Sequence, residues 1–324
     1  MTMGKKKKET YPAPVLKGTV HKPNMKKKIL ARWQLYLMIL IPILHVCLHS
    51  YYPLPGIQIA FRKYTMKGGI WGSKWVGLDN FERFLNSPMF ELILKNTLTL
   101  SLYSLCTFPI TIIFALFLNC MLHPRYKKVI QTTTYIPHFI STVVIVGLIN
   151  QVFHERSGIY GALAKLITGK QPTSLFANGK LFKHFYVWSG VWQGTGYGSI
   201  LYIAGLSSVD TELYDAAEID GASRFQRLLY IDLPTLMPTI SLQFVMRIGG
   251  IMGVGYAKIY LMQNDLNINY SEVISTYEYK MGLASGSPDY SLSTAIGLWN
   301  TVINFILMRI ANFVSAKLGG STLF

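Results

Sequence analysis

Carboxylates gather in one polar stretch, residues 209–234, between two apolar segments. Asp210, Glu212 and Asp220 could imitate the acid and base of a membrane enzyme such as a glycosyltransferase, because paired carboxylates can move protons. They have no pocket of their own, and the stretch follows a regular helix–glycine–helix pattern around Gly221. We therefore interpret these acids as part of a helical surface rather than as a catalytic site.

The sequence contains neither a nucleotide-binding motif nor a cysteine pattern that would bind a metal ion. The chain contains no G-x-x-x-x-G-K-[ST] sequence, since Gly4 and its lysines lack the first glycine and the hydroxyl residue. The three cysteines, Cys47, Cys106 and Cys120, lie within apolar runs without metal-site spacing, and an odd, buried set does not form a disulfide framework. The sequence predicts no cofactor bound by this chain.

Sugar-binding chemistry is available in one apolar segment, residues 184–208. Glycines separate its aromatic and amide side chains, which are Trp188, Trp192, Gln193, Tyr197 and Tyr202. Aromatic rings stack on pyranose faces, while amides and phenols bind hydroxyls. The same composition also suits close packing of membrane helices, where small residues let backbones approach. Both interpretations stand on the sequence.

Arg247 is a cation in the middle of an apolar segment. It follows Pro234 by 13 residues, which places it ~20 Å deep at 1.5 Å per residue. An arginine at that depth costs at least ~2.5 kcal/mol and needs a partner or water. A substrate carboxylate would pair with it bidentately, whereas the alternative is a hydrogen bond to carbonyls of a neighbouring span. Arg309 lies nearer a helix end and can snorkel.

The elements that must position these groups are membrane helices. The 324 residues are 51% hydrophobic and only 14% charged, compared with about 25% charged in a typical soluble protein. Six apolar segments are long enough to cross ~30 Å of hydrocarbon, roughly 33–53, 94–122, 131–153, 184–208, 235–257 and 291–316. The sequence predicts an all-α, polytopic integral membrane protein with about six transmembrane helices.

Positive charge predicts the orientation of these helices. Residues 1–32 form a basic tail with ten Lys/Arg and one acid, so it carries +9 of the net +16. We expect the tail to face the cytoplasm and anionic membrane lipid, and without aromatic interleaving it does not indicate nucleic-acid binding. Six spans then place both termini inside, the loops 54–93, 154–183 and 258–290 outside, and residues 209–234 inside.

The stretch 213–238 resembles the Glu-Ala-Ala loop of membrane subunits of binding-protein-dependent ABC importers. That loop reads Glu-Ala-Ala, three residues, Gly, nine residues, Ile, one residue, Leu-Pro. Seven positions here have that spacing, namely Asp215, Ala216, Ala217, Gly221, Ile231, Leu233 and Pro234. Asp215 stands in place of the glutamate, which keeps the carboxylate but on a shorter side chain. Other segments resemble the oligo- and polysaccharide members of the carbohydrate-uptake branch, such as the larger maltose permease subunit and alginate-oligosaccharide permeases: 75–81, 96–98, 135–137 and 294–298.

The resemblance implies a type I ABC importer permease fold over residues 33–324, with 209–234 as the coupling loop that seats on an ATPase. The coupling residues that it implies are Asp215, Ala216, Ala217, Glu218, Asp220, Gly221, Ala222 and Ser223. ATP and Mg²⁺ belong to the partner ATPase, so this chain is not itself an enzyme. A second permease subunit in a heterodimer and an extracytoplasmic solute-binding protein complete an oligosaccharide importer of the bacterial cytoplasmic membrane, with anionic uronate or alginate oligomers among its expected cargo.

The resemblance also implies where substrate binds. Counted from the coupling loop, the sugar contacts of the related maltose permease fall on Gln193, Gly194 and Tyr197 before it, with Trp192 beside them, and on Arg247, Gly250, Ile251 and Val254 after it. The alternative function is a standalone, ion-coupled secondary transporter. Such carriers often show internal repeats and intramembrane acids, and this chain shows neither. Genes for a second permease, an ATPase and a solute-binding protein beside this one would separate the two functions.

Overall fold

The computed structural model describes residues 32–317, so the basic tail predicted for 1–32 lies outside the described residues, apart from Arg32. The chain divides into two compact units, Met1–Pro55 and Gly56–Phe324. In the first unit, helix α2 (Trp33–Val46) continues into the π-helical turn η1 (Cys47–Tyr51). Pro42 lies inside α2, which membrane helices tolerate.

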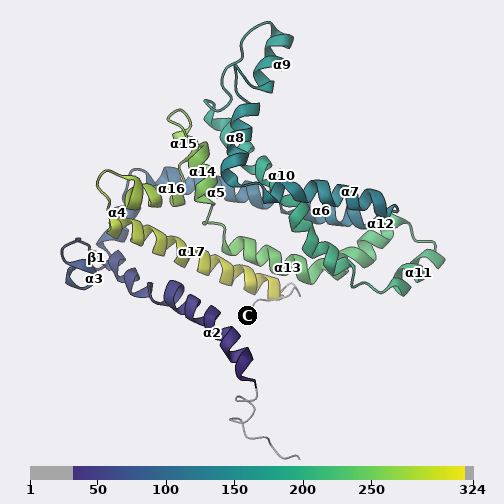
Figure 1. Cartoon of the computed structure of the whole chain (residues 1–324), viewed down its shortest axis with the longest axis horizontal. Coiled ribbons are helices and arrows are strands. Elements are labelled where there is room, and N and C mark those ends of the chain that lie inside the picture. Colours follow the sequence, from purple (N-terminus) through teal and green to yellow (C-terminus); the bar gives the residue numbers. More distant parts are fainter. Residues whose placement is uncertain (1–31, 318–324) are drawn as a thin grey trace, which may run out of the picture. The chain divides into compact units, whose positions relative to one another are not determined.

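The second unit consists almost entirely of helices (Figure 1). Its first part contains η2 (Leu54–Phe61, which begins just before the unit boundary), β1 (Arg62–Lys63), α3 (Gly69–Gly72), β2 (Lys74–Trp75), α4 (Asp79–Leu85), α5 (Phe90–Cys106), α6 (Phe108–Asn119), α7 (Pro124–Tyr135), η3 (Ile136–Phe139), α8 (Thr142–Val152) and α9 (Ile159–Thr168). Its second part contains α10 (Gly179–Leu206), α11 (Thr211–Ile219), α12 (Arg224–Arg227), η4 (Leu228–Asp232), α13 (Leu233–Gly249), α14 (Tyr256–Met262), α15 (Ile268–Ser271), α16 (Ile274–Tyr279), η5 (Lys280–Ala284) and α17 (Tyr290–Lys317). The two short strands pair antiparallel.

Long apolar helices match the predicted spans, and the all-helical class is confirmed. Within residues 32–317, four unbroken helical stretches are long and apolar enough to cross a membrane: Trp33–Phe61, Phe90–Asn119, Arg224–Gly249 and Tyr290–Lys317. The predicted span 184–208 corresponds to α10, which has 28 residues but falls outside that apolar set. Lys180, Lys183, Gln193 and its glycines lower the hydropathy of this helix.

The predicted span 131–153 is not one straight helix. It is broken into α7 with η3 and α8, which meet at a bend of 101°. Pro137 lies in η3, and the side chain of Ser141 accepts a hydrogen bond from the backbone N–H of Val144 as the N-cap of α8. Because proline removes a donor and a capping serine starts a new helix, this local sequence favours a break.

The predicted span 235–257 ends early. Helix α13 begins at Leu233 with Pro234 in its first turn, but it ends at Gly249. The following turn contains Gly250, Gly253 and Gly255 before α14 begins. Glycines weaken a helix because they lose more backbone entropy than other residues, so this short run ends α13 inside the predicted span.

Three buried clusters hold the helices around the site described below. Leu116 of α6, Tyr202 of α10 and Leu236 of α13 belong to the first cluster. A second cluster contains Ile296 of α17 and Ile93 of α5, and a third contains Phe182 of α10 and Ile259 of α14. Helix α10 therefore contacts α6 along one side and α13 along another, and the space among these helices is where a cavity can form.

Candidate functional site

The stretch 209–234 forms two helices with a glycine turn between them. Asp210 caps α11, because its side chain accepts a hydrogen bond from the backbone N–H of Glu212. Ser223 and Gln226 form a capping box at the start of α12. Capping of this kind satisfies backbone donors that a helix start leaves unpaired, so short helices are stable here. The predicted helix–glycine–helix unit is confirmed.

Gly221 makes the turn between α11 and α12. Its φ angle is +74°, and a Cβ atom built on it would have no heavy atom within 4 Å from any described residue other than its two chain neighbours. Glycine is therefore required here for backbone conformation and not for lack of space within the chain.

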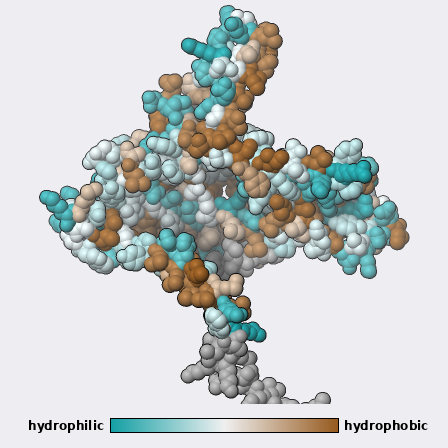
Figure 2. Space-filling model, in the orientation of Figure 1, coloured by the Kyte–Doolittle hydropathy of each residue, from teal (hydrophilic) through white to brown (hydrophobic). Residues whose placement is uncertain are grey.

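The coupling residues inferred from the sequence lie on the surface of this segment. Six of the eight are exposed, and Ala217 and Ala222 are partly buried. Large apolar side chains also face outward, with 87% of Ile219 and 68% of Phe225 exposed. Figure 2 shows hydrophobic surface beside hydrophilic surface at the right-hand end, where α11 lies in Figure 1. An exposed apolar surface with a polar rim is typical of a site for another protein.

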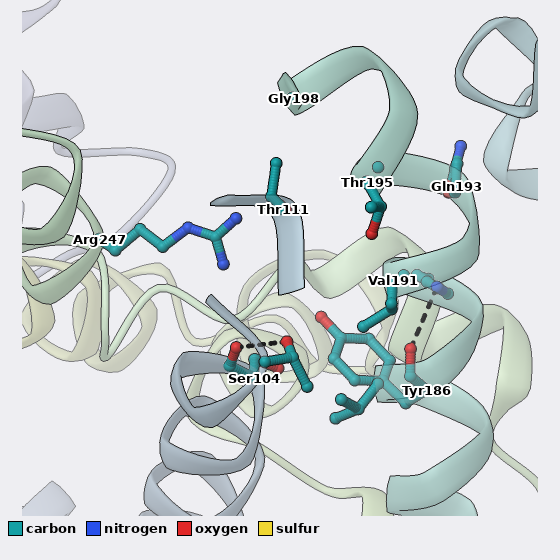
Figure 3. A pocket seen from close by; sticks show the side chains of 13 residues that line it. Ser104, Thr111, Tyr186, Val191, Gln193, Thr195, Gly198 and Arg247 are labelled. Carbon is teal, nitrogen blue, oxygen red and sulfur yellow. Dashed lines mark hydrogen bonds between the residues drawn. The ribbon is translucent and has the colours of Figure 1, made fainter. Parts of the chain in front are cut away.

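A cavity of about 350 Å³ lies among α5, α6, α10, α13 and α14. Its lining is mainly hydroxyl, amide and cationic, and includes Ser104, Thr107, Thr111, Thr195, Arg247 and Lys258. In Figure 3 the Arg247 side chain enters from one side, and Tyr186, Val191 and Thr195 of α10 line the other. Hydroxyl groups of this kind can bind the hydroxyls of a sugar.

Arg247 lines this cavity and two neighbouring hollows. Its guanidinium lies 5.3 Å from the ring centroid of Phe108, a cation–π contact. Within the part of the chain that the structure describes, no carboxylate forms an ion pair with it. Arg247 is exposed in this single chain, so apart from its contact with Phe108 its charge faces the cavity.

Lys258 is a second cation in the same cavity. It was not among the candidate site residues that the sequence suggested. Its Nζ donates a hydrogen bond of 3.2 Å to the backbone oxygen of Tyr186 and lies 5.2 Å from that ring's centroid. In the sequence Lys258 looks like an ordinary charge at the end of an apolar segment. Ser104, Thr107 and Thr111 were also missed, although their spacing of three and four residues places them on one helical face.

The substrate residues inferred from the maltose permease do not all line one cavity. Gln193, Gly194 and Arg247 line the first; Gly250, Ile251 and Val254 line a neighbouring hollow with Arg247; Tyr197 lines a third. Trp192 lines none of these three, and 53% of it is exposed. Gly250, Ile251 and Val254 were expected on the predicted span 235–257. That expectation is wrong, because α13 ends at Gly249 and these three residues lie in the turn that follows it.

Some groups of α10 pack helices rather than face the cavity. Trp188 donates a 2.8 Å hydrogen bond from Nε1 to the hydroxyl of Tyr103, and Tyr202 is buried in the core. A Cβ on Gly196 would lie 2.2 Å from the backbone oxygen of Thr134, so this glycine allows α7 to approach. Gln193 does both, because it lines the first cavity and its amide also donates a hydrogen bond to the backbone oxygen of Ile140. Helix packing thus accounts for part of the composition that had suggested sugar binding.

Comparisons with known proteins agree on one class. Residues 107–320 match the family described as binding-protein-dependent transport system inner membrane component. Protein LplB of Bacillus subtilis is 38% identical, over 98% of this chain and 100% of that protein. The polygalacturonan/rhamnogalacturonan transport system permease protein YteP of the same organism is 36% identical over 95% and 96%. A crystal structure of a bacterial alginate ABC transporter, in complex with an alginate pentasaccharide-bound periplasmic protein, contains a chain 34% identical to this one, with a TM-score of 0.82 over 92% of this chain and 99% of that one.

Proposed function

This chain belongs to the family of binding-protein-dependent transport system inner membrane components, and we propose that it forms one half of a translocation pathway for oligosaccharides that carry carboxylates. It is a permease subunit of an ABC importer with the predicted permease fold, and ATP hydrolysis belongs to a separate subunit. The observation that carries the substrate assignment is Arg247, whose charge faces the cavity without a carboxylate partner in residues 32–317.

Charge and hydroxyl chemistry both support an acidic sugar. Arg247 would bind one carboxylate bidentately, and Lys258 supplies a second positive charge to the same cavity. Ser104, Thr107 and Thr111 offer hydroxyls from α5, α6 and the turn between them. The similar transporter of known structure imports alginate, an acidic polysaccharide, which agrees with a cationic pathway.

Three kinds of partner complete the importer. A second permease subunit closes the exposed side of the cavity, a heterodimer being the arrangement that we infer. An ATPase binds the exposed surface of α11 and α12 and holds ATP and Mg²⁺. An extracytoplasmic solute-binding protein delivers the sugar, as the periplasmic protein in the similar alginate complex suggests. The assembly lies in the bacterial cytoplasmic membrane with both termini of this chain inside.

The experiment is reconstitution of the complete importer in proteoliposomes. This chain is co-expressed with a candidate second permease, an ATPase and a solute-binding protein. Alginate pentasaccharide should stimulate ATP hydrolysis and accumulate inside, and neutral arabino-oligosaccharides should do so far less. Equal transport of both sugars contradicts the acidic-substrate proposal. Transport by this chain alone, driven by an ion gradient, contradicts the importer arrangement.

Cysteine labelling tests the orientation. Ser157 and Ser287 are exposed and lie in the loops expected outside, so Ser157→Cys and Ser287→Cys in a cysteine-free background should react with an impermeant maleimide added to intact cells. Ser208→Cys, directly before the stretch 209–234 that is expected inside, is the matched control, because Ser208 is also exposed; it should react only after the cells are opened. Labelling in the reverse pattern inverts the topology.

A further inference from the structure

Asp232 is a buried carboxylate where the coupling segment enters the membrane helices. Only 3% of it is exposed, and it ends the π-helical turn η4 just before α13 begins. A buried carboxylate is costly unless hydrogen bonds or a cation compensate for lost water. Single π-helical turns inside α-helices occur frequently at functional sites. The contacts of Asp232 must therefore offset the free energy lost when its carboxylate leaves water, and their position in a π-helical turn suggests a functional role.

Two neutral donors from two other elements offset that cost. The hydroxyl of Tyr214, on α11, donates to Oδ1 of Asp232, and the amide of Asn119, at the end of α6, donates to Oδ2 at 3.4 Å. Burial and the bond to Asp232 raise the pKa of Tyr214 to about 12, so this phenol keeps its proton and remains a donor at neutral pH. One carboxylate thus joins α11, α6 and the start of α13.

No cation in the described part of the chain pairs with Asp232. Arg224 and Arg227 line the same hollow of about 230 Å³, but Arg227 pairs with Glu218 of α11 at 3.5 Å. That ion pair joins α11 to α12, involves an exposed carboxylate and is worth little by itself. The hydrogen bond from Tyr214 to the buried Asp232 is the stronger connection between α11 and the membrane helices.

We propose that Asp232 is a positioning residue, which through Tyr214 and Asn119 makes α11 move together with α6 and α13. This proposal rests on the proposed function, in which an ATPase moves α11. If α11 shifts against α13, the Tyr214 bond breaks and a buried carboxylate loses a donor, which opposes the shift. Displacement of α11 by the ATPase is therefore carried into two helices that line the cavity. Without the carboxylate, α11 can move while the membrane helices stay in place.

The test uses the complete importer in proteoliposomes, with alginate pentasaccharide as the probe. Three forms are compared with the natural chain: Tyr214→Phe, Asp232→Leu and the double variant. The measured quantities are the ratio of sugar imported to ATP hydrolysed, the Tm and co-purification with the ATPase. Tyr230→Phe is the matched control, because Tyr230 lies in the same turn η4 and is 77% exposed.

Stability and coupling should separate in these variants. Tyr214→Phe leaves a buried carboxylate short of a donor and should lower Tm. The double variant removes both members of the Tyr214–Asp232 pair and leaves only the Asn119 amide, which lines the adjoining hollow, without this acceptor, so it should recover most of the Tm. The ratio of sugar imported to ATP hydrolysed should nonetheless fall on the order of tenfold in all three, the size of effect that a hydrogen bond to a charged group supports. The ATPase should remain bound, and Tyr230→Phe should behave as the natural chain.

Three outcomes would overturn the proposal. A double variant that recovers its transport ratio together with its Tm shows that the group only stabilises the fold. An unchanged ratio of sugar imported to ATP hydrolysed in Tyr214→Phe shows that the hydrogen bond is not needed for coupling. An equal fall of this ratio in Tyr230→Phe shows that the effect comes from any change in η4 and is not specific to Asp232. These results differ from failure of the proposed function, in which the natural chain with its partners does not import the pentasaccharide.

Discussion

Arg247→Gln is expected to lower the response of the reconstituted importer to alginate pentasaccharide by about tenfold to a hundredfold. The guanidinium faces the cavity without a carboxylate partner in the described part of the chain, and a hydrogen bond to a charged group contributes roughly 1.5–3 kcal/mol. Glutamine keeps a donor and removes the charge. The measurement is sugar-stimulated ATP hydrolysis over a range of pentasaccharide concentrations, with transport measured in parallel.

Arg247→Lys separates charge from geometry. Lysine keeps the positive charge but loses the planar pair of donors that matches a carboxylate. We expect an intermediate loss, smaller than for Arg247→Gln. Loss of the second cation in Lys258→Met should raise the pentasaccharide concentration needed for half-maximal stimulation, because Lys258 lines the same cavity.

A neutral sugar and a distant cation serve as controls for Arg247. Arabino-oligosaccharides carry no carboxylate, so any small stimulation that they give should change little in the variants. Lys180 lies in the first turn of α10, is exposed and lines none of the three cavities, and Lys180→Gln should have no effect. If Arg247→Gln imports the acidic sugar at the natural rate, the arginine has a structural role and the acidic-substrate proposal loses its main support.

The coupling segment could be predicted from the sequence because its information is local. Fixed spacing around Gly221, a capping acid at Asp210 and a proline in the first turn of the next helix each specify nearby backbone geometry. The structure shows the predicted turn at Gly221, with α11 capped by Asp210 and Pro234 in the first turn of α13. What a local pattern does not contain is the pairing of Tyr214 with Asp232, which are 18 residues apart and meet only after α11 folds back.

The cavity was less predictable because helices distant in sequence line it. Arg247 stood out as a charge within an apolar run, whereas Lys258, eleven residues later, looked like the polar end of the same run. The run of Gly250, Gly253 and Gly255 ends α13 and turns Lys258 back towards Tyr186. Helical spacing does not continue beyond Gly249, since an irregular turn does not keep the rise of an α-helix.

Bends in the membrane helices follow the same logic. Pro137 and Ser141 are visible in the sequence, yet a window of hydropathy averages over them and yields one span. Their effect depends on whether the backbone groups released at the bend find other partners. Gln193 of α10 donates to the backbone oxygen of Ile140 at the bend, so a residue first interpreted as a sugar contact helps to hold a broken helix.

Gly221→Val is expected to uncouple the importer, with ATP-driven transport reduced more than tenfold while the chain remains in the membrane. The φ angle of Gly221 is +74°, a region that costs other residues roughly 1–2 kcal/mol and is especially unfavourable for a β-branched side chain. Relieving that strain changes the turn between α11 and α12. The ATPase surface on these two helices would then lose its geometry, although no described residue beyond the two chain neighbours has an atom within 4 Å of the new Cβ.

Gly169→Val is the matched control. Gly169 has a φ of +71° and equally open surroundings, but it ends α9, in a loop expected outside. It should cost similar backbone strain without changing the ratio of sugar imported to ATP hydrolysed. Gly221→Ala should lie between the natural chain and valine, because alanine tolerates the left-handed region better than a branched residue. Natural transport by Gly221→Val would show that the segment 209–234 does not transmit the action of the ATPase, whereas equal losses in Gly169→Val would attribute the effect to general strain.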